Sequence, residues 1–148
     1  MTDSVRKKIL VIGNQGYVGS LLVKNLKTNT SNDILGLDNG IYSKLVTSPH
    51  DPDQFLDKQF NQDVRNFDPE VLKNVKAVIY LAAISNDPMG NKYEILTREV
   101  NYSSCLKIAN YAKKSGVEKF IFASSCSVYG FGGDSSKKEN DALDPLTA

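Results

Sequence analysis

The sequence has little of several residues that carry common kinds of chemistry. Among its 148 residues there are a single histidine, His50, no tryptophan, and two cysteines, Cys105 and Cys126, 21 positions apart. One histidine is too few for most histidine-based metal sites and catalytic triads. The cysteine spacing indicates neither a disulfide framework nor a metal knuckle. We therefore expect no bound metal.

The charge balance and the apolar runs exclude further classes of protein. The 18 basic and 17 acidic residues leave a net charge of +1, which gives no electrostatic case for binding nucleic acid or an anionic membrane. The longest apolar runs, such as 77–84, are far shorter than the roughly 20 residues that span a bilayer. The apolar stretch behind the basic residues 6–8 stops at Gly13, too short for a signal peptide core, which predicts a cytoplasmic protein.

The remaining composition, 41% hydrophobic and 24% charged, is typical of a single folded domain. Short continuous apolar runs alternate with stretches of helical periodicity, and such runs indicate strands buried on both faces. This alternation predicts an α/β fold, a parallel sheet with helices on both faces. The expected strands are 8–12, 34–37, 59–64, 77–81 and 120–123, and the expected helices are 17–26, 69–74 and 93–115.

Residues 13–19, GNQGYVG, join the first expected strand to the first expected helix. Glycines in such a turn let the chain leave the strand sharply, let the backbone approach a pyrophosphate, and let the helix pack closely on the strand. The helix N-terminus adds free N–H groups and a partial positive charge for phosphates. Glycines three apart also occur in plain surface turns, but the strand before and the helix after them favour a dinucleotide site.

Asp38 ends the second expected strand, 19 residues after Gly19. A carboxylate there accepts hydrogen bonds from a ribose diol and repels a 2′-phosphate. No arginine follows it closely, which favours NAD over NADP and disfavours an NADPH-dependent reductase. Residues 38–40, Asp-Asn-Gly, are also a common turn sequence. Both interpretations hold together, because the turn can position the carboxylate.

The Gly-x-x-Gly-x-x-Gly spacing resembles the extended short-chain dehydrogenase/reductase superfamily, with its NAD-dependent nucleotide-sugar epimerases and dehydratases. Four further motifs follow in the family's order: DVR at 63–65, LAA at 81–83, Asn101 in the next helix, and SSCSVYG at 124–130. The resemblance implies a Rossmann-like doubly wound parallel sheet that stops after about the fifth strand. Residues 1–148 would then be the NAD-binding Rossmann domain without its last strands and its substrate lobe.

The resemblance also implies which residues hold the cofactor, and it shows two departures from the family pattern. The family often has Thr-Gly-Gly at positions 12–14, where this chain has Ile-Gly-Asn, and often has histidine at the position of Tyr80. Neither change removes a backbone contact, so NAD stays the expected cofactor. The implied cofactor-binding residues are Gly13, Gln15, Gly16, Tyr17, Val18, Gly19, Asp38, Asn39, Asp63, Val64, Leu81, Ala82, Ala83 and Asn101.

The chemistry implied by the resemblance is hydride transfer between a sugar carbon and NAD, with a tyrosine as general base. A Ser or Thr hydroxyl holds the sugar oxygen, and counting four residues back from Tyr129 assigns this role to Ser125, with Ser127 as second choice. A capped strand end is the alternative for these serines. The Tyr-x-x-x-Lys pair is expected beyond residue 148, so we expect this chain alone not to turn over a sugar nucleotide.

An alternative hypothesis is a non-catalytic NAD(H)-sensing module that is complete at 148 residues. A gene that continues into a Tyr-x-x-x-Lys pair would favour the enzyme, and a natural stop codon would favour the sensor. The resemblance further implies a nucleotide-sugar substrate for the full-length protein. It also implies a homodimer formed through a helix pair that includes 93–115.

Overall fold

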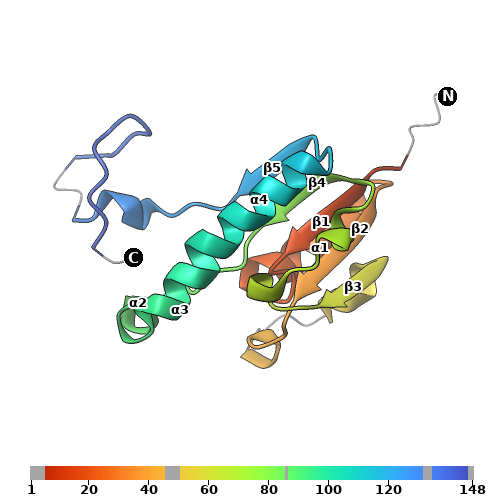
Figure 1. Cartoon of the computed structure of the whole chain (residues 1–148), viewed down its shortest axis with the longest axis horizontal. Helices are drawn as coiled ribbons and strands as arrows, with labels where there is room; N and C mark the ends of the chain where they lie inside the picture. Colours follow the sequence, from red (N-terminus) through yellow and green to blue (C-terminus); the bar gives the residue numbers. More distant parts are fainter. Residues whose placement is uncertain (1–5, 46–50, 86, 132–134, 147–148) are drawn as a thin grey trace.

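The computed structural model describes residues 6–45, 51–85, 87–131 and 135–146, and within them five parallel strands form one sheet (Figure 1). The order is β3-β2-β1-β4-β5, so the chain builds outward from β1 on one side and then crosses to the other. This doubly wound parallel sheet confirms the predicted fold class. The strands are β1 (Lys8–Ile12), β2 (Asp33–Asp38), β3 (Lys58–Asn61), β4 (Val75–Tyr80) and β5 (Lys119–Phe122).

Helices and short helical turns connect these strands. The third strand is shorter than predicted: it ends at Asn61, because the Asp63 side chain caps a 3-10 turn directly after it. The connections are α1 (Tyr17–Asn29), η1 (Ser43–Leu45), η2 (Pro52–Phe55), η3 (Val64–Asn66), η4 (Pro69–Leu72), α2 (Asp87–Lys92), α3 (Glu94–Arg98), the π-helical η5 (Glu99–Ser104), α4 (Cys105–Lys114) and η6 (Cys126–Tyr129). Pro49 and His50 lie outside the described residues. No described helix is long and apolar enough to cross a membrane.

Alternate residues of β1 build the two halves of the core. Leu10 and Ile12 are completely buried in the cluster that contains Ile108 of α4, whose helix lies along one face of the sheet in Figure 1. Val11 is equally buried but points to the other face, where it packs in a cluster with Val23 of α1. Since successive side chains of a strand alternate in direction, a continuous apolar run must be covered on both sides. The predicted helices on both faces are confirmed.

The helix predicted over 93–115 contains a π-helical segment between α3 and α4. The apolar positions Val100 and Cys105, both packed against the core, lie five residues apart, which is the spacing of a π turn rather than of an α-helix. The extra residue explains why the apolar stripe is imperfect when it is measured with α-helical spacing. The predicted stop at Gly116 is confirmed by its φ of +75°, which L-residues rarely adopt.

A buried asparagine and a partly buried glutamine meet at Gly36 in β2. Asn14 is fully buried, and its Nδ2 donates to Gln59 Oε1 on β3 at 2.9 Å. Both side chains cross Gly36, where a Cβ would contact Gln59 Oε1 and lie 2.7 Å from Asn14 Cγ. Asn14 therefore fits in the sheet because Gly36 has no side chain.

Replacing Gly36 with alanine should lower the free energy of unfolding by about 1–3 kcal/mol, because the methyl group overpacks the amide pair. Urea unfolding would measure this effect. Gly90→Ala is the matched control, since a Cβ there meets nothing within 4 Å. A Gly36→Ala variant as stable as the Gly90→Ala variant would contradict the close fit.

Candidate functional site

A cavity lies at the carboxyl ends of the central strands. The chain leaves β1 toward β2 on one side and the sheet continues with β4 on the other, and ligands of doubly wound sheets bind at such a crossing point. The glycine-rich turn, the end of β2, the segment after β3, the end of β4 and the π turn all contribute to its lining. The lining residues are Gly13, Gly16, Leu37, Asp38, Asn39, Ile41, Tyr42, Gln62, Asp63, Val64, Leu81, Ala82, Ala83 and Val100.

The three glycines of the first turn have different surroundings. Gly13 has a φ of +87°, and a Cβ there would lie 2.7 Å from the Ala82 nitrogen. A Cβ on Gly19 would lie 2.7 Å from Asn14 Cα, so the first turn of α1 packs directly on backbone. A Cβ on Gly16 would meet only the Gly13 oxygen, at 3.4 Å, and Gly16 lines the cavity. Gly13 and Gly19 are therefore required by packing, whereas Gly16 leaves space for a ligand.

The start of α1 is open to an anion. Gly16 occupies the N-cap position without a side-chain cap, and the 13-residue helix begins at Tyr17. The N–H groups of the first turn and the positive end of the helix dipole therefore face the rim of the cavity. This arrangement suits a phosphate group.

Asp38 lines the cavity beside the glycine-rich turn, with its carboxylate fixed by backbone N–H groups. Its Oδ1 accepts from the Gly40 N–H at 2.9 Å, and its Oδ2 accepts from the Gln15 N–H at 3.1 Å. The Asp-Asn-Gly turn thus orients the carboxylate, which confirms the turn, and the contact of Asp38 with a ribose stays a prediction. Gln15 acts on the site through its backbone.

A charged network closes the far end of the cavity. Asp63 Oδ1 accepts from the Arg65 N–H at 2.9 Å and from Arg65 Nε at 3.0 Å. Its Oδ2 accepts from an Arg65 guanidinium nitrogen at 2.8 Å and from Asn39 Nδ2 at 3.2 Å. The hydrogen bond from the Arg65 side chain outweighs burial and lowers the pKa of Asp63 to about 2. Arg65 also pairs with Glu99 on η5, at 3.6 Å.

Hydrogen bonds from η5 hold the segment after β4. Asn101 donates from Nδ2 to the Ile84 oxygen at 2.9 Å and accepts from the Ile84 N–H at 2.8 Å. The Tyr80 hydroxyl donates to the Val100 oxygen at 2.9 Å, and burial raises the pKa of this phenol. Tyr80, one of the two departures from the family pattern, therefore supplies a partner for a carbonyl of the π turn.

The structure brings most of the predicted cofactor residues together. Nine of them line the cavity: Gly13, Gly16, Asp38, Asn39, Asp63, Val64, Leu81, Ala82 and Ala83. Tyr17 and Val18 are exposed on α1, Gly19 packs under the turn, and Asn101 contacts Ile84. Sequence reasoning missed the lining residues Leu37, Ile41, Tyr42, Gln62 and Val100. Each lies within three residues of a predicted residue along the chain, and this proximity is the only signal that could have found them.

Ser125 and Ser127 are not among the residues that line the cavity. Ser125 Oγ accepts from the Ser127 N–H at 3.1 Å and caps η6, and both serines are exposed. In Figure 1, η6 and the segment after it lie apart from the sheet. The structure thus shows the capping contact, and the catalytic role of Ser125 stays a prediction.

The site suits a dinucleotide better than a metal. An anion-binding helix start, a carboxylate fixed by backbone N–H groups and an apolar wall at Leu81–Ala83 follow one another around the cavity. A Cβ on Gly16 would meet only the Gly13 oxygen, so the backbone of the turn is open on this side, which suits a phosphate. Within the part of the chain that the structure describes, no cluster of His, Cys, Asp or Glu could hold a metal ion.

The fold and the site define a nucleotide-binding protein of the Rossmann type. The chain belongs to the NAD dependent epimerase/dehydratase family, whose model matches residues 9–148. A UDP-glucose 4-epimerase of Vibrio cholerae is 33% identical over 129 residues, which are 85% of this chain and 37% of that protein.

Solved structures share the fold of this chain. The NAD dependent-NDP-hexosamine 5,6-dehydratase TunA superposes with a TM-score of 0.83 at 23% identity, over 96% of this chain and 45% of that one. UDP-glucuronic acid 4-epimerase from Bacillus cereus, solved with UDP-glucuronic acid and NAD, has a TM-score of 0.79 at 25% identity, over 95% of this chain and 46% of that one. The chain therefore spans less than half the length of these relatives.

The low pKa of Asp63 predicts an acid-dependent loss of stability. A carboxyl whose pKa falls from 3.8 to about 2 on folding stabilises the protein above pH 4 and loses this contribution as the pH falls to 2. Asp63→Asn should therefore lower the free energy of unfolding by at most about 2 kcal/mol at pH 7, with a difference near zero at pH 2. Urea unfolding between pH 2 and 7 would measure this difference.

Asp68→Asn provides the control, because Asp68 is an exposed carboxylate that caps η4. A stability difference for Asp63→Asn that stays constant between pH 4 and 2 would contradict the assigned pairing with Arg65.

Proposed function

We propose that this chain binds NAD and forms the cofactor-binding part of an enzyme that converts nucleotide sugars by hydride transfer. The observation that carries the proposal is the open space beside Gly16, between the start of α1 and the fixed carboxylate of Asp38. The family and the NAD-bound Bacillus cereus epimerase support it. We also propose a cytoplasmic location.

Different residues of the site would bind different parts of NAD. The N–H groups after Gly16 would bind the pyrophosphate, and Asp38 would accept the ribose hydroxyls. The apolar segment Leu81–Ala83 would border the nicotinamide side. A carboxylate has about four acceptor positions, and Asp63 already accepts four hydrogen bonds from Asn39 and Arg65. The adenine would therefore be held by the apolar walls and the backbone beside Val64 rather than by a free Asp63 oxygen.

The proposed reaction places the substrate at the carboxyl edge of the sheet. Bound NAD would supply the hydride acceptor. A tyrosine base beyond residue 148 would take the proton of a sugar hydroxyl, and Ser125 Oγ would hold the sugar oxygen. Ser125 reaches that position only if η6 packs over the sheet edge in the full-length protein. The relative that was solved with UDP-glucuronic acid supports a nucleotide sugar as the substrate class.

Two substitutions test the binding of NAD. Gly16→Val would place methyl groups in the space meant for the pyrophosphate without displacing backbone, and Asp38→Ala would remove the ribose acceptor. Each should weaken NAD binding by at least about ten-fold, the equivalent of about 1.4 kcal/mol, in isothermal calorimetry. Circular dichroism should show that both variants stay folded. Undiminished affinity in both variants would refute the assigned roles.

We propose that the intact protein forms a homodimer through the long helical segment. Three large apolar side chains, Ile95, Tyr102 and Leu106, are 80%, 59% and 50% exposed along α3, η5 and α4. They are seven and four residues apart, so they follow one another along the same helical segment. An exposed apolar stripe on a long helix favours pairing with a second helix.

Leu106→Glu tests this surface, because a buried and unpaired carboxylate would oppose association. Analytical ultracentrifugation should show a dimer for the parent protein and at least a ten-fold weaker dimer for the variant. Leu21→Glu on α1, where the side chain is 54% exposed, is the control. Equal weakening by both variants would place the interface elsewhere.

A further inference from the structure

We infer that Asp53 is a second determinant of cofactor choice, acting together with Asp38 against a 2′-phosphate. The inference rests on the proposed binding of NAD. In that proposal Asp38 receives the adenosine ribose, so the phosphate that distinguishes NADP from NAD would lie beside this carboxylate. Asp53 does not line the cavity, but it comes close to Asp38 from a different segment of the chain, because both bond Gln15.

Gln15 connects the two carboxylates. Its backbone nitrogen lies 3.1 Å from Asp38 Oδ2, and its side-chain Nε2 lies 3.0 Å and 3.3 Å from the two carboxylate oxygens of Asp53. A Cβ on Gly40, in the turn after Asp38, would lie 3.2 Å from Gln15 Oε1, so the carboxamide lies against that turn. Asp38 and Asp53 therefore flank one residue of the glycine-rich turn.

The core, rather than the exposed hydrogen bond, fixes the place of Asp53. Phe55 and Leu56 pack against the core cluster between α1 and β2. Asp57 Oδ2 accepts from the Ile34 N–H at 2.7 Å and ties the segment to the start of β2. Asp53 lies two residues before this anchored stretch, in η2, whose backbone packs on α1. Its carboxylate is thus held near the turn even when its bond to Gln15 opens.

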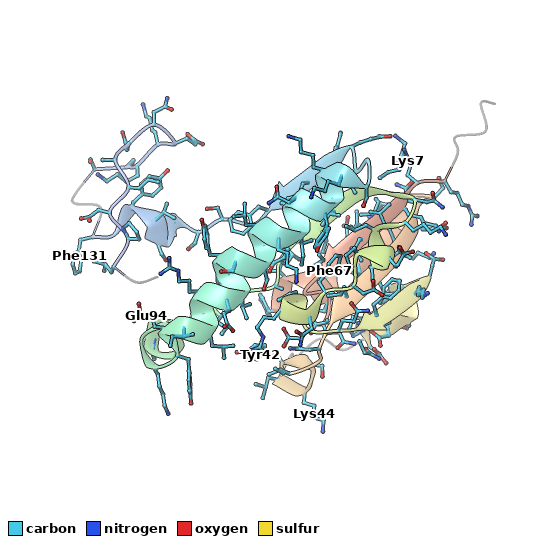
Figure 2. All side chains as sticks on the ribbon, viewed as in Figure 1. Lys7, Tyr42, Lys44, Phe67, Glu94 and Phe131 are labelled. Carbon is cyan, nitrogen blue, oxygen red and sulfur yellow. The ribbon has the colours of Figure 1, made fainter. Side chains whose placement is uncertain are left out.

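The two carboxylates have no basic partner at this rim. Among the residues that the structure describes, no lysine or arginine forms an ion pair with either Asp38 or Asp53. The bond from Gln15 comes from a neutral amide, so it orients Asp53 without cancelling its charge. Lys44 is the first basic residue after Asp38, and Figure 2 shows its side chain pointing away from the sheet.

The negative charge of Asp53 should affect the binding of NADP but not that of NAD. A 2′-phosphate carries a charge of about −1.5 to −2 at pH 7, whereas the 2′-hydroxyl of NAD carries none. Across roughly 8 Å near a protein surface, one carboxylate would weaken the binding of such a phosphate by about three- to ten-fold. Asp53 should therefore reduce the affinity for NADP and leave the affinity for NAD unchanged.

The test measures NAD and NADP binding to the 148-residue chain by calorimetry at low salt, with Asp53→Asn and Asp53→Lys as variants. Asp33→Asn is the matched control, because it removes one charge at the opposite end of β2. We expect NADP to bind about three- to ten-fold more tightly to Asp53→Asn, and more tightly still to Asp53→Lys. NAD affinity should stay within about two-fold, and 0.5 M salt should shrink the gain because it screens exposed charges.

Three outcomes would overturn the inference. An unchanged ratio of NADP to NAD affinity in both Asp53 variants would show that its charge does not reach the phosphate. An equal gain in Asp33→Asn would show an effect of net charge alone, and an equal gain for NAD would show a change in the turn itself. If the parent chain binds no NAD at all, the proposed function fails, and this result is distinct from NAD binding with unchanged selectivity.

Discussion

The fold depends on a close contact between backbone segments where β1 ends. Gly13 lies against the backbone of Ala82, and Gly19 lies against the backbone of Asn14. Neither place has room for a Cβ, so any side chain would push α1 or the segment after β4 away from the sheet. Because this contact holds the turn in place, the N-terminus of α1 faces the same cavity as the carboxylate of Asp38.

The two departures from the family pattern are accommodated by partners elsewhere in the chain. Asn14 replaces a glycine, and over Gly36 its buried Nδ2 donates to Gln59, whereas its buried Oδ1 has no hydrogen-bond partner among the described residues. Tyr80 replaces a histidine, and its hydroxyl bonds a carbonyl of the π turn. A buried polar group without such a partner would be costly. In each departure, a second residue that is distant in sequence bonds one polar group of the substituted side chain.

The cavity is assembled by residues that hold one another as much as by those that would face a ligand. Arg65 joins Asp63 to Glu99, and Asn101 joins η5 to the segment after β4. Three chain segments that meet only in the folded protein are thereby linked around one end of the site. Phe67, which is labelled in Figure 2, is buried in the core cluster that contains Ile108 of α4, and its ring lies 6.4 Å from that of Tyr111.

The sequence by itself determined the parallel sheet, the helices on its two faces and the glycine-rich turn with Asp38, because apolar runs and glycine spacing report local geometry directly. The resemblance to the family supplied the other six of the nine predicted lining residues. It could not place the π turn, because one extra residue in a helix makes the apolar spacing irregular without showing where the extra residue lies. It could not show Ile41 or Tyr42 at the cavity, or Asp53 beside Gln15, because those contacts arise when loops pack on the sheet. The tertiary structure also decided the role of each glycine, because only the neighbouring atoms show whether a Cβ would fit at that position.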